Sequence, residues 1–148
     1  MKTILITAAD LTNGAFTGML KPVDGPGGYF IGSVIIDENL GLVKFPYGLK
    51  VYGSITVGDG SEISSESLIS CAGSIKSLGN LVAGRLEVDG SIEIGGSLMV
   101  RESIFANDFI DVGDTIIAGG SIFAEGYIMT GGNISPLPDE PHLVRQST

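Results

Sequence analysis

The stretch GGSIFAEGYIMTGGNI, residues 119–134, repeats its pattern every six positions. Ile122, Ile128 and Ile134 lie six residues apart, and a glycine stands two positions before each of them. Continuing the same step toward the N-terminus reaches only aliphatic residues, which are Ile116, Ile110, Ile104, Leu98, Ile92 and Leu86. An unbroken run of this length indicates an internal repeat and hence a repeat architecture.

Each six-residue unit has an aliphatic residue, a small or aliphatic residue two places later, and mostly a glycine or acid two places after that. This alternation is typical of a β-strand, in which successive side chains point to opposite faces. Because six is even, the inward phase persists, and we interpret the glycine or acid as a corner that needs a positive φ or a local side-chain hydrogen bond. Three units make one rung, and rungs stack at about 4.8 Å. The sequence therefore predicts an all-β fold, a single-stranded parallel β-helix (triangular β-solenoid), right-handed, with an N-terminal β cap.

The same step continues nearer the N-terminus, but in a different phase. Its members are Val51, Val57, Ile63, Ile69, Ile75 and Leu81. Leu81 and Leu86 are five residues apart instead of six, so we expect a one-residue deletion or a bulge within LVAGRL, residues 81–86.

The repeats divide the chain into three parts. Residues 1–48 show no clear sixes, and we expect an irregular β cap or first rungs there, with a separate small binding module as the alternative. Residues 49–135 form the predicted solenoid, with three six-residue units to a rung. Residues 136–148 form a proline-rich tail, and because proline cannot donate a hydrogen bond to a β-ladder, the solenoid is predicted to end after Ile134.

The units LEVDGS, IEIGGS and IIAGGS resemble the bactofilin repeat, and the resemblance covers about residues 50–134. It implies a right-handed triangular β-helix and a structural, self-associating role, since bactofilins are cytoskeletal proteins whose rods join end to end. The apolar N-terminal segment and the sequence PLPDEP at 136–141 depart from that family's pattern. We expect them to cap the rod, and capped ends stop strand addition.

Residue types that enzymes need are scarce in this chain. Left-handed hexapeptide acyltransferases use a histidine at a subunit groove, and the similar carbonic anhydrases need three for zinc, whereas the only histidine here is His142. Cys71 falls in the inward phase, where we expect a small buried hydrophobe instead of a nucleophile. Asp59 and Glu62 fit a glycine-rich corner better than a calcium loop, because the glycine-rich nonapeptide of such loops does not recur. We expect no enzymatic activity, no catalytic residue, no metal and no cofactor.

The composition limits the partners. Lysine and arginine number 8 against 17 aspartates and glutamates, a net charge of −9, which argues against direct nucleic-acid binding because that requires cationic groups. With one cysteine, no intramolecular disulfide can form. No stretch approaches the roughly 20 apolar residues of a membrane span, and the short apolar start does not resemble a signal peptide, so we expect a cytoplasmic protein.

Outward positions carry the candidate interaction residues, which are Phe105, Phe109, Phe123, Tyr127, Met99 and Ile117. Folding the sequence by one rung stacks the four aromatic residues into one patch on the last two rungs, and stacks Met99 on Ile117 on the next face. Outward aromatic residues in a contiguous array are typical of an interface. We expect contact with a second copy of the chain, as a dimer or higher assembly. The alternative is that the N-terminal segment or the tail covers the patch.

Acidic residues are the second outward signal. Residues 86–134 contain eight acids against one base, Arg101. The acidic surface comprises Glu87, Asp89, Glu93, Asp111 and Glu125. The simplest interpretation is a solubilising surface; the sharper one is a nucleic-acid mimic. The sequence thus predicts a non-enzymatic structural or protein-binding solenoid that associates with itself. The alternative is a small acidic phage-type inhibitor, anti-CRISPR or anti-restriction, that binds a basic nucleic-acid-binding complex.

Overall fold

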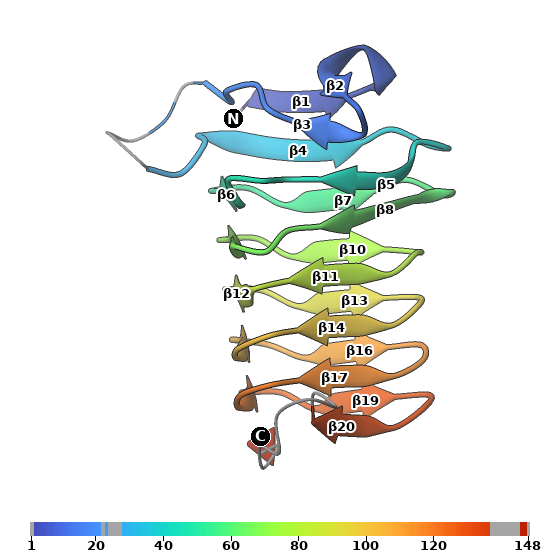
Figure 1. The fold of residues 1–148 in the computed structure, drawn as a ribbon. Coiled ribbons are helices and arrows are strands. Elements are labelled where there is room, and N and C mark those ends of the chain that lie inside the picture. The colour runs from blue at the N-terminus through green and yellow to red at the C-terminus, as the bar shows by residue number, and fades with distance from the viewer. Residues whose placement is uncertain (1, 22, 24–27, 137–145, 148) are drawn as a thin grey trace.

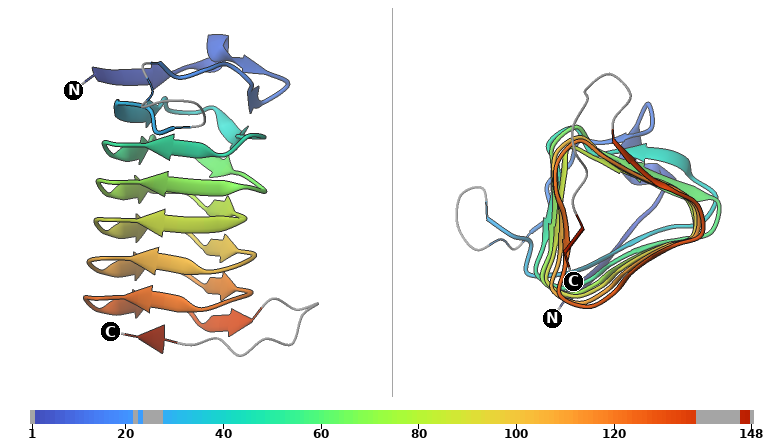
Figure 2. Two further views of the ribbon diagram at one scale, coloured as in Figure 1. Left: turned by 90° about the vertical axis from the view of Figure 1, so that its left-hand side faces the viewer. Right: turned by 90° about the horizontal axis from the view of Figure 1, so that it is seen from below.

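The chain winds into a right-handed triangular β-solenoid of about 6 turns, which confirms the predicted fold class. The computed structural model describes residues 2–21, 23, 28–136 and 146–147. Figure 2, seen along the axis from the C-terminal end, shows three sides meeting at three corners. The chain turns counterclockwise as it comes toward the viewer, which makes the coil right-handed. Among the described residues the only helical turn is the 3-10 helix η1 (Ala8–Asp10).

Each side of the triangle is one sheet, here called side A, B or C. The strands of side A are β1 (Lys2–Ile6), β4 (Gly32–Ile36), β7 (Ile55–Val57), β10 (Ile75–Ser77), β13 (Ile92–Ile94), β16 (Ile110–Val112) and β19 (Ile128–Thr130). Those of side B are β2 (Leu11–Thr12), β3 (Ala15–Phe16), β5 (Gly41–Lys44), β8 (Ser61–Ser64), β11 (Leu81–Ala83), β14 (Leu98–Val100), β17 (Ile116–Ala118) and β20 (Ile134–Pro136). Those of side C are β6 (Leu49–Val51), β9 (Leu68–Cys71), β12 (Arg85–Val88), β15 (Ile104–Ala106), β18 (Ile122–Ala124) and β21 (Gln146–Ser147).

The strands are taken here as six rungs, numbered from β4–β5–β6 (rung 1) to β19–β20–β21 (rung 6). All named strand pairs are parallel except β2 with β3. The inward residues stack rung on rung, as Ile92 does on Ile110 and Leu98 on Ile116, and these four side chains have 0 % exposure. The six-residue period therefore builds one continuous core along the axis.

The register break is a shortened corner in rung 3. Leu81 pairs with Leu98, and Leu98 pairs with Ile116, so the first step along the chain is one residue shorter than the second. Only Gly84 separates β11 from β12, so the predicted one-residue deletion is confirmed. A β-carbon at Gly84 would overlap the carbonyl oxygen of Glu66 in the rung above, so only glycine fits this tight corner.

The upper rungs are longer, and one part of the predicted phase is wrong there. Ile55 pairs with Ile75, a longer step along the chain than any in the lower rungs. The six-residue period predicts that Val57 stacks on Ile75. In the structure Val57 pairs with Ser77 instead, so it occupies the second inward position of its strand. Val51 pairs in the same way with Cys71. The corners of these rungs are longer, as at Gly60 with φ 77°, so the six-residue period does not give the correct pairing there.

The N-terminal segment joins the same sheets. β1 pairs with β4, and β4 and β5 pair with β7 and β8, so residues 32–44 form two sides of rung 1. The antiparallel pair β2–β3 sits at the N-terminal edge of side B. The outermost strand at this edge is β2, which runs opposite to the other strands of side B. A strand of another molecule that continued the parallel ladder of side B would therefore run antiparallel to β2.

At the C-terminal end the pairing extends further than predicted. Pro136 is the last residue of β20, and β21 pairs with β18 through Ile122–Gln146 and Phe123–Ser147. The expected stop after Ile134 is therefore wrong. Pro136 is tolerated because β20 is the last strand of side B, where no following strand of the sheet needs its missing N–H.

The recurrent corner glycines have a different cause from the one expected. Within residues 51–136 only Gly60 has a positive φ. A β-carbon at Gly120 would lie 2.8 Å from Ser103 Oγ, and one at Gly132 would lie 2.8 Å from Thr115 Oγ1. Close stacking of successive corners, instead of backbone handedness, thus favours glycine at these positions.

Candidate interaction surface

The outward residues of side C change character along the axis. From rung 1 to rung 5 they are Lys50, Ser70, Glu87, Phe105 and Phe123. Ser70 is buried because the hydroxyl of Tyr29 covers it, with Tyr29 Oη 2.8 Å from Ser70 Oγ. Polar positions thus give way to phenylalanine at rung 4.

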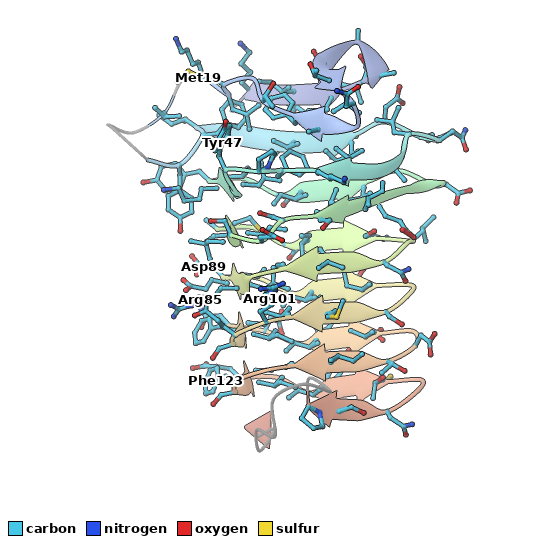
Figure 3. The ribbon with its side chains drawn as sticks, viewed as in Figure 1. Met19, Tyr47, Arg85, Asp89, Arg101 and Phe123 are labelled. Atoms are coloured by element: carbon cyan, nitrogen blue, oxygen red, sulfur yellow. The ribbon has the colours of Figure 1, made fainter. Side chains whose placement is uncertain are left out.

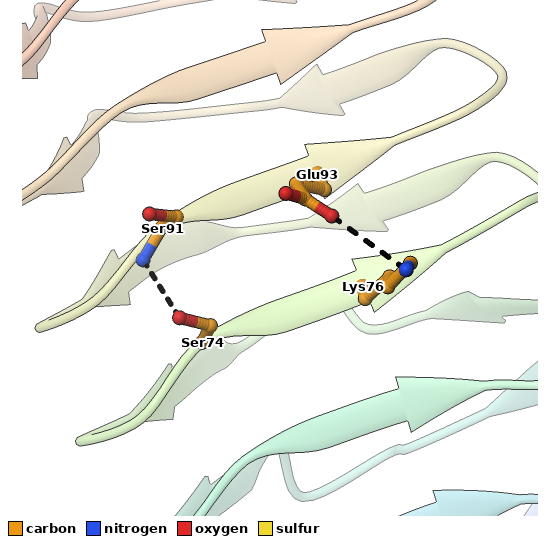
Figure 4. A network of polar contacts seen from close by, with 4 residues as sticks. All are labelled: Ser74, Lys76, Ser91 and Glu93. Atoms are coloured by element: carbon orange, nitrogen blue, oxygen red, sulfur yellow. Dashed lines mark hydrogen bonds and ion pairs between the residues drawn. The ribbon is translucent and has the colours of Figure 1, made fainter.

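The C–A corner shows the same change. Ser54, Ser74 and Ser91 stack there, and the Ser91 backbone N–H donates to Ser74 Oγ at 3.0 Å (Figure 4). In the next two rungs Phe109 and Tyr127 take this position, directly before β16 and β19. The serine ladder therefore ends at the height where side C becomes aromatic.

The aromatic side chains form two stacks. The rings of Phe105 and Phe123 are 5.0 Å apart between centroids and 8° from parallel. Those of Phe109 and Tyr127 are 4.9 Å apart and 5° from parallel. No ring contact joins the two stacks in the described part of the chain, and each stack is a pair that the sequence predicts. Phe105 is 37 % and Tyr127 49 % exposed.

Side B carries an apolar column that the repeat predicts only in part. Met99 pairs with Ile117 as expected, and Val82 pairs with Met99 above them. The six-residue repeat alone does not place Val82 in this column, because a step of one full rung fails across the short corner at Gly84. A step one residue shorter places Val82 above Met99. On side A the outward Met129, 55 % exposed, follows Asp111.

Two of the predicted acidic residues have cationic partners from neighbouring positions. Lys76 Nζ lies 4.0 Å from Glu93 Oε2 across rungs 3 and 4, as Figure 4 shows. Arg85 Nε lies 2.6 Å from Glu87 Oε2 on side C. Both cations precede residues 86–134 in the sequence. Counting the charges of that segment alone therefore overstates the negative charge of this surface. These exposed pairs each contribute at most about 1 kcal/mol.

The other three predicted acids are spread over two parts of the surface. Asp111 stacks below Glu93 on side A. Asp89 and Glu125 are exposed where side C meets the C–A corner, and Figure 3 labels Asp89 on the flank of the molecule where β12 lies. No ion pair forms at these three residues within the described chain. Their carboxylates are open to a cationic group of another molecule.

The surface has several hollows among its described residues. A groove of about 210 Å³ at the N-terminal end is lined mainly by apolar residues, including Phe16, Met19, Leu20 and Tyr47. Among the described residues no group of three or more histidine, cysteine, aspartate or glutamate side chains could hold a metal ion. His142 lies outside the described residues. In the part of the chain that is described, no helix has the length and apolarity to cross a membrane.

Cys71 is a core residue of side C. It is buried, and its thiol lies 3.6 Å from the carbonyl oxygen of Gly73, which can accept its hydrogen. Burial, aided by the charge of Asp89, raises the pKa of the Cys71 thiol from 9.0 to about 12. The thiol therefore stays protonated at neutral pH, and Cys71 packs as a small apolar side chain.

This pKa predicts a loss of stability at high pH. The folded thiol binds its proton up to about pH 12, whereas the unfolded thiol releases it from about pH 9, so stability is unaffected below pH 9 and falls between pH 9 and 12. At pH 10.5 the expected loss is about 2 kcal/mol. Urea denaturation of the wild type and of Cys71→Ala between pH 8 and 11 measures it. A loss of the same size in the alanine variant would assign the effect to other groups.

No protein-family model, no curated protein and no solved structure matches the chain. The resemblance to bactofilins is therefore one of repeat pattern and solenoid architecture.

Proposed function

We propose that the chain is a non-enzymatic structural scaffold that associates with itself through the outward apolar residues of its lower rungs. One observation supports this most strongly: separate outward columns turn from polar to apolar along the axis. Side C changes at Phe105, the C–A corner at Phe109 and side B at Val82. Contiguous outward apolar residues of this kind are typical of a protein interaction site.

The energetics favour burial of these residues in a contact. Phe105 and Met99 are each 37 % exposed although they project from rigid strands, so a partner can cover them with little loss of side-chain freedom. The ring stacks also hold the phenylalanine side chains in place, and aromatic pairs contribute about 0.5–1.5 kcal/mol beyond their buried area. Aromatic residues and methionine are enriched at protein interfaces.

The ends of the rod support a discrete assembly over an open filament. End-to-end growth would continue all three sheets from one molecule into the next. At the N-terminal end the antiparallel β2–β3 pair occupies side B, so this edge does not offer the parallel ladder found along the rest of the solenoid. This edge therefore favours a dimer through the sides of the rods.

Replacing Phe105 and Phe123 together by serine is expected to abolish self-association. The phenyl rings supply the apolar centre of side C, and serine leaves the strands and their backbone pairing unchanged. Light scattering after size exclusion, at low and high salt, measures the assembly. An apolar contact keeps a dimer at high salt. The control is Ile35→Ser with Leu42→Ser, which removes exposed apolar residues near the N-terminal end. A monomer at both salt concentrations and at protein concentrations up to about 500 µM would contradict the proposal.

A second candidate is an acidic inhibitor of a basic partner, for instance a nucleic-acid-binding complex of the kind that phage proteins block. The exposed carboxylates of Asp89 and Glu125, for which no ion pair forms within the described residues, favour it. Such binding weakens steeply with salt and tolerates serine at the two phenylalanine positions. A pull-down at two salt concentrations with the double serine variant separates the two candidates.

A further inference from the structure

Three rungs of side C each present three outward residues, at the position before the strand's first inward residue, in its middle and after it. In rung 3 they are Arg85, Glu87 and Asp89; in rung 4, Ser103, Phe105 and Asn107; in rung 5, Ser121, Phe123 and Glu125. Figure 3 shows Arg85, Asp89 and Phe123 on the flank of the molecule where β12 lies. A cation therefore stands at one edge of this side and anions stand at the other, with two phenylalanines between them.

We propose that two copies of the chain pack side C against side C in the same direction, related by a two-fold axis parallel to the solenoid axis. This deepens the proposed self-association and rests on it. Such an axis keeps each rung at its height and exchanges the two edges of the side, so each contact occurs twice. Arg85 of one copy then faces Asp89 of the second copy, and Asp89 faces Arg85.

The other rungs are complementary under the same axis. Phe105 and Phe123 each meet their own counterparts at the centre, where the apolar contact forms. At the edges Ser121 faces Glu125 and Ser103 faces Asn107, pairs that can form hydrogen bonds. Glu87 faces Glu87, but Arg85 lies 2.6 Å from this carboxylate in each copy and offsets its charge.

The opposite, antiparallel arrangement lacks this match. An axis perpendicular to the rods keeps each edge facing itself and inverts the order of the rungs. Arg85 would then face only Ser103, Ser121 or another Arg85 among the outward residues of its edge. Above rung 3 the contact is bounded by Tyr29, which covers Ser70, and by Lys50, which lies 5.8 Å from the Tyr29 ring centroid.

The area buried between the two copies limits the affinity of the dimer. Three rungs at about 4.8 Å and five residues at about 3.3 Å give roughly 240 Å² for each copy, on the order of 500 Å² in total. Stable complexes bury about 1,200 Å² or more, so this dimer is weak and depends on protein concentration. Sedimentation equilibrium of the full chain from about 10 µM to about 500 µM covers the range in which such a dimer forms.

Charge reversal tests the register. Arg85→Asp alone places acids opposite Asp89, and Asp89→Arg alone places arginines opposite Arg85, so each variant is expected to dimerise at least tenfold more weakly than the wild type. An equimolar mixture of the two variants restores the dimer as a heterodimer, because every acid then faces an arginine. The double variant restores it as a homodimer. Arg85 is 54 % exposed and Asp89 is exposed, so both variants are expected to fold, which circular dichroism verifies.

The matched control reverses charges on side A, with Lys76→Asp and Asp111→Arg, and is expected to leave the dimer unchanged. A wild-type dimer that the single side C variants do not weaken, or whose loss the mixture does not reverse, would overturn this arrangement and leave the proposed self-association standing. A wild type that is monomeric up to about 500 µM would overturn both.

Discussion

Replacing Ile116 by alanine is expected to lower the free energy of unfolding by about 3–4 kcal/mol. Ile116 has 0 % exposure and stacks between Leu98 above and Ile134 below. In a solenoid each rung is stabilised mainly by its two neighbours, so a cavity in rung 5 weakens two interfaces at once. Urea denaturation followed by far-ultraviolet circular dichroism measures the change.

The next residue in the chain supplies the control. Ile117 has the same side chain in the same strand but points outward and is half-buried. Ile117→Ala is expected to lower the free energy of unfolding by less than about 1 kcal/mol, because it leaves no internal cavity. Equal losses for the two variants would contradict the inward–outward alternation on which the fold depends.

The lower half of the rod was predictable because its rungs keep one length. From Leu86 onward each rung holds three repeat units, so counting alone stacks Leu86 on Ile104 and Phe105 on Phe123. The inward phase and the ring stacks follow from this fixed period. The sequence also predicts the stack of Phe109 on Tyr127, but it does not show that these rings make no ring contact with Phe105 and Phe123, because corner geometry decides the direction of these side chains.

The upper half was less predictable because pairing there spans variable lengths. Lys2 pairs with Gly32 and Ile55 pairs with Ile75, steps that differ from each other and from the regular repeat, so no single period describes these rungs. Val57 was assigned to the wrong inward position for this reason. Contacts between rungs were hidden in the same way: the pair of Lys76 with Glu93 spans the short corner at Gly84, so it becomes visible only once that corner is known.

Replacing Gly113 by alanine is expected to lower the free energy of unfolding by about 2–3 kcal/mol, although this residue is exposed. A β-carbon at Gly95 would lie 2.7 Å from the carbonyl oxygen of Leu78, and one at Gly113 would lie closer still to the oxygen of Gly95. The backbone cannot easily move away, because the Gly113 N–H donates to the Ile94 oxygen at 2.7 Å. The strain is therefore distributed over two stacked corners.

Gly126→Ala is the matched control, since this glycine also lies in a corner of the lower rungs. Its β-carbon would lie 3.0 Å from the Asp108 oxygen, and Asp108 itself holds the equivalent position one rung above, so a side chain can be accommodated there. We expect a loss of about 1 kcal/mol or less. If both variants unfold at the same urea concentration, backbone entropy and not close stacking explains the glycines. If Gly113→Ala is as stable as the wild type, a β-carbon fits at this corner, and the close contacts do not explain the glycine.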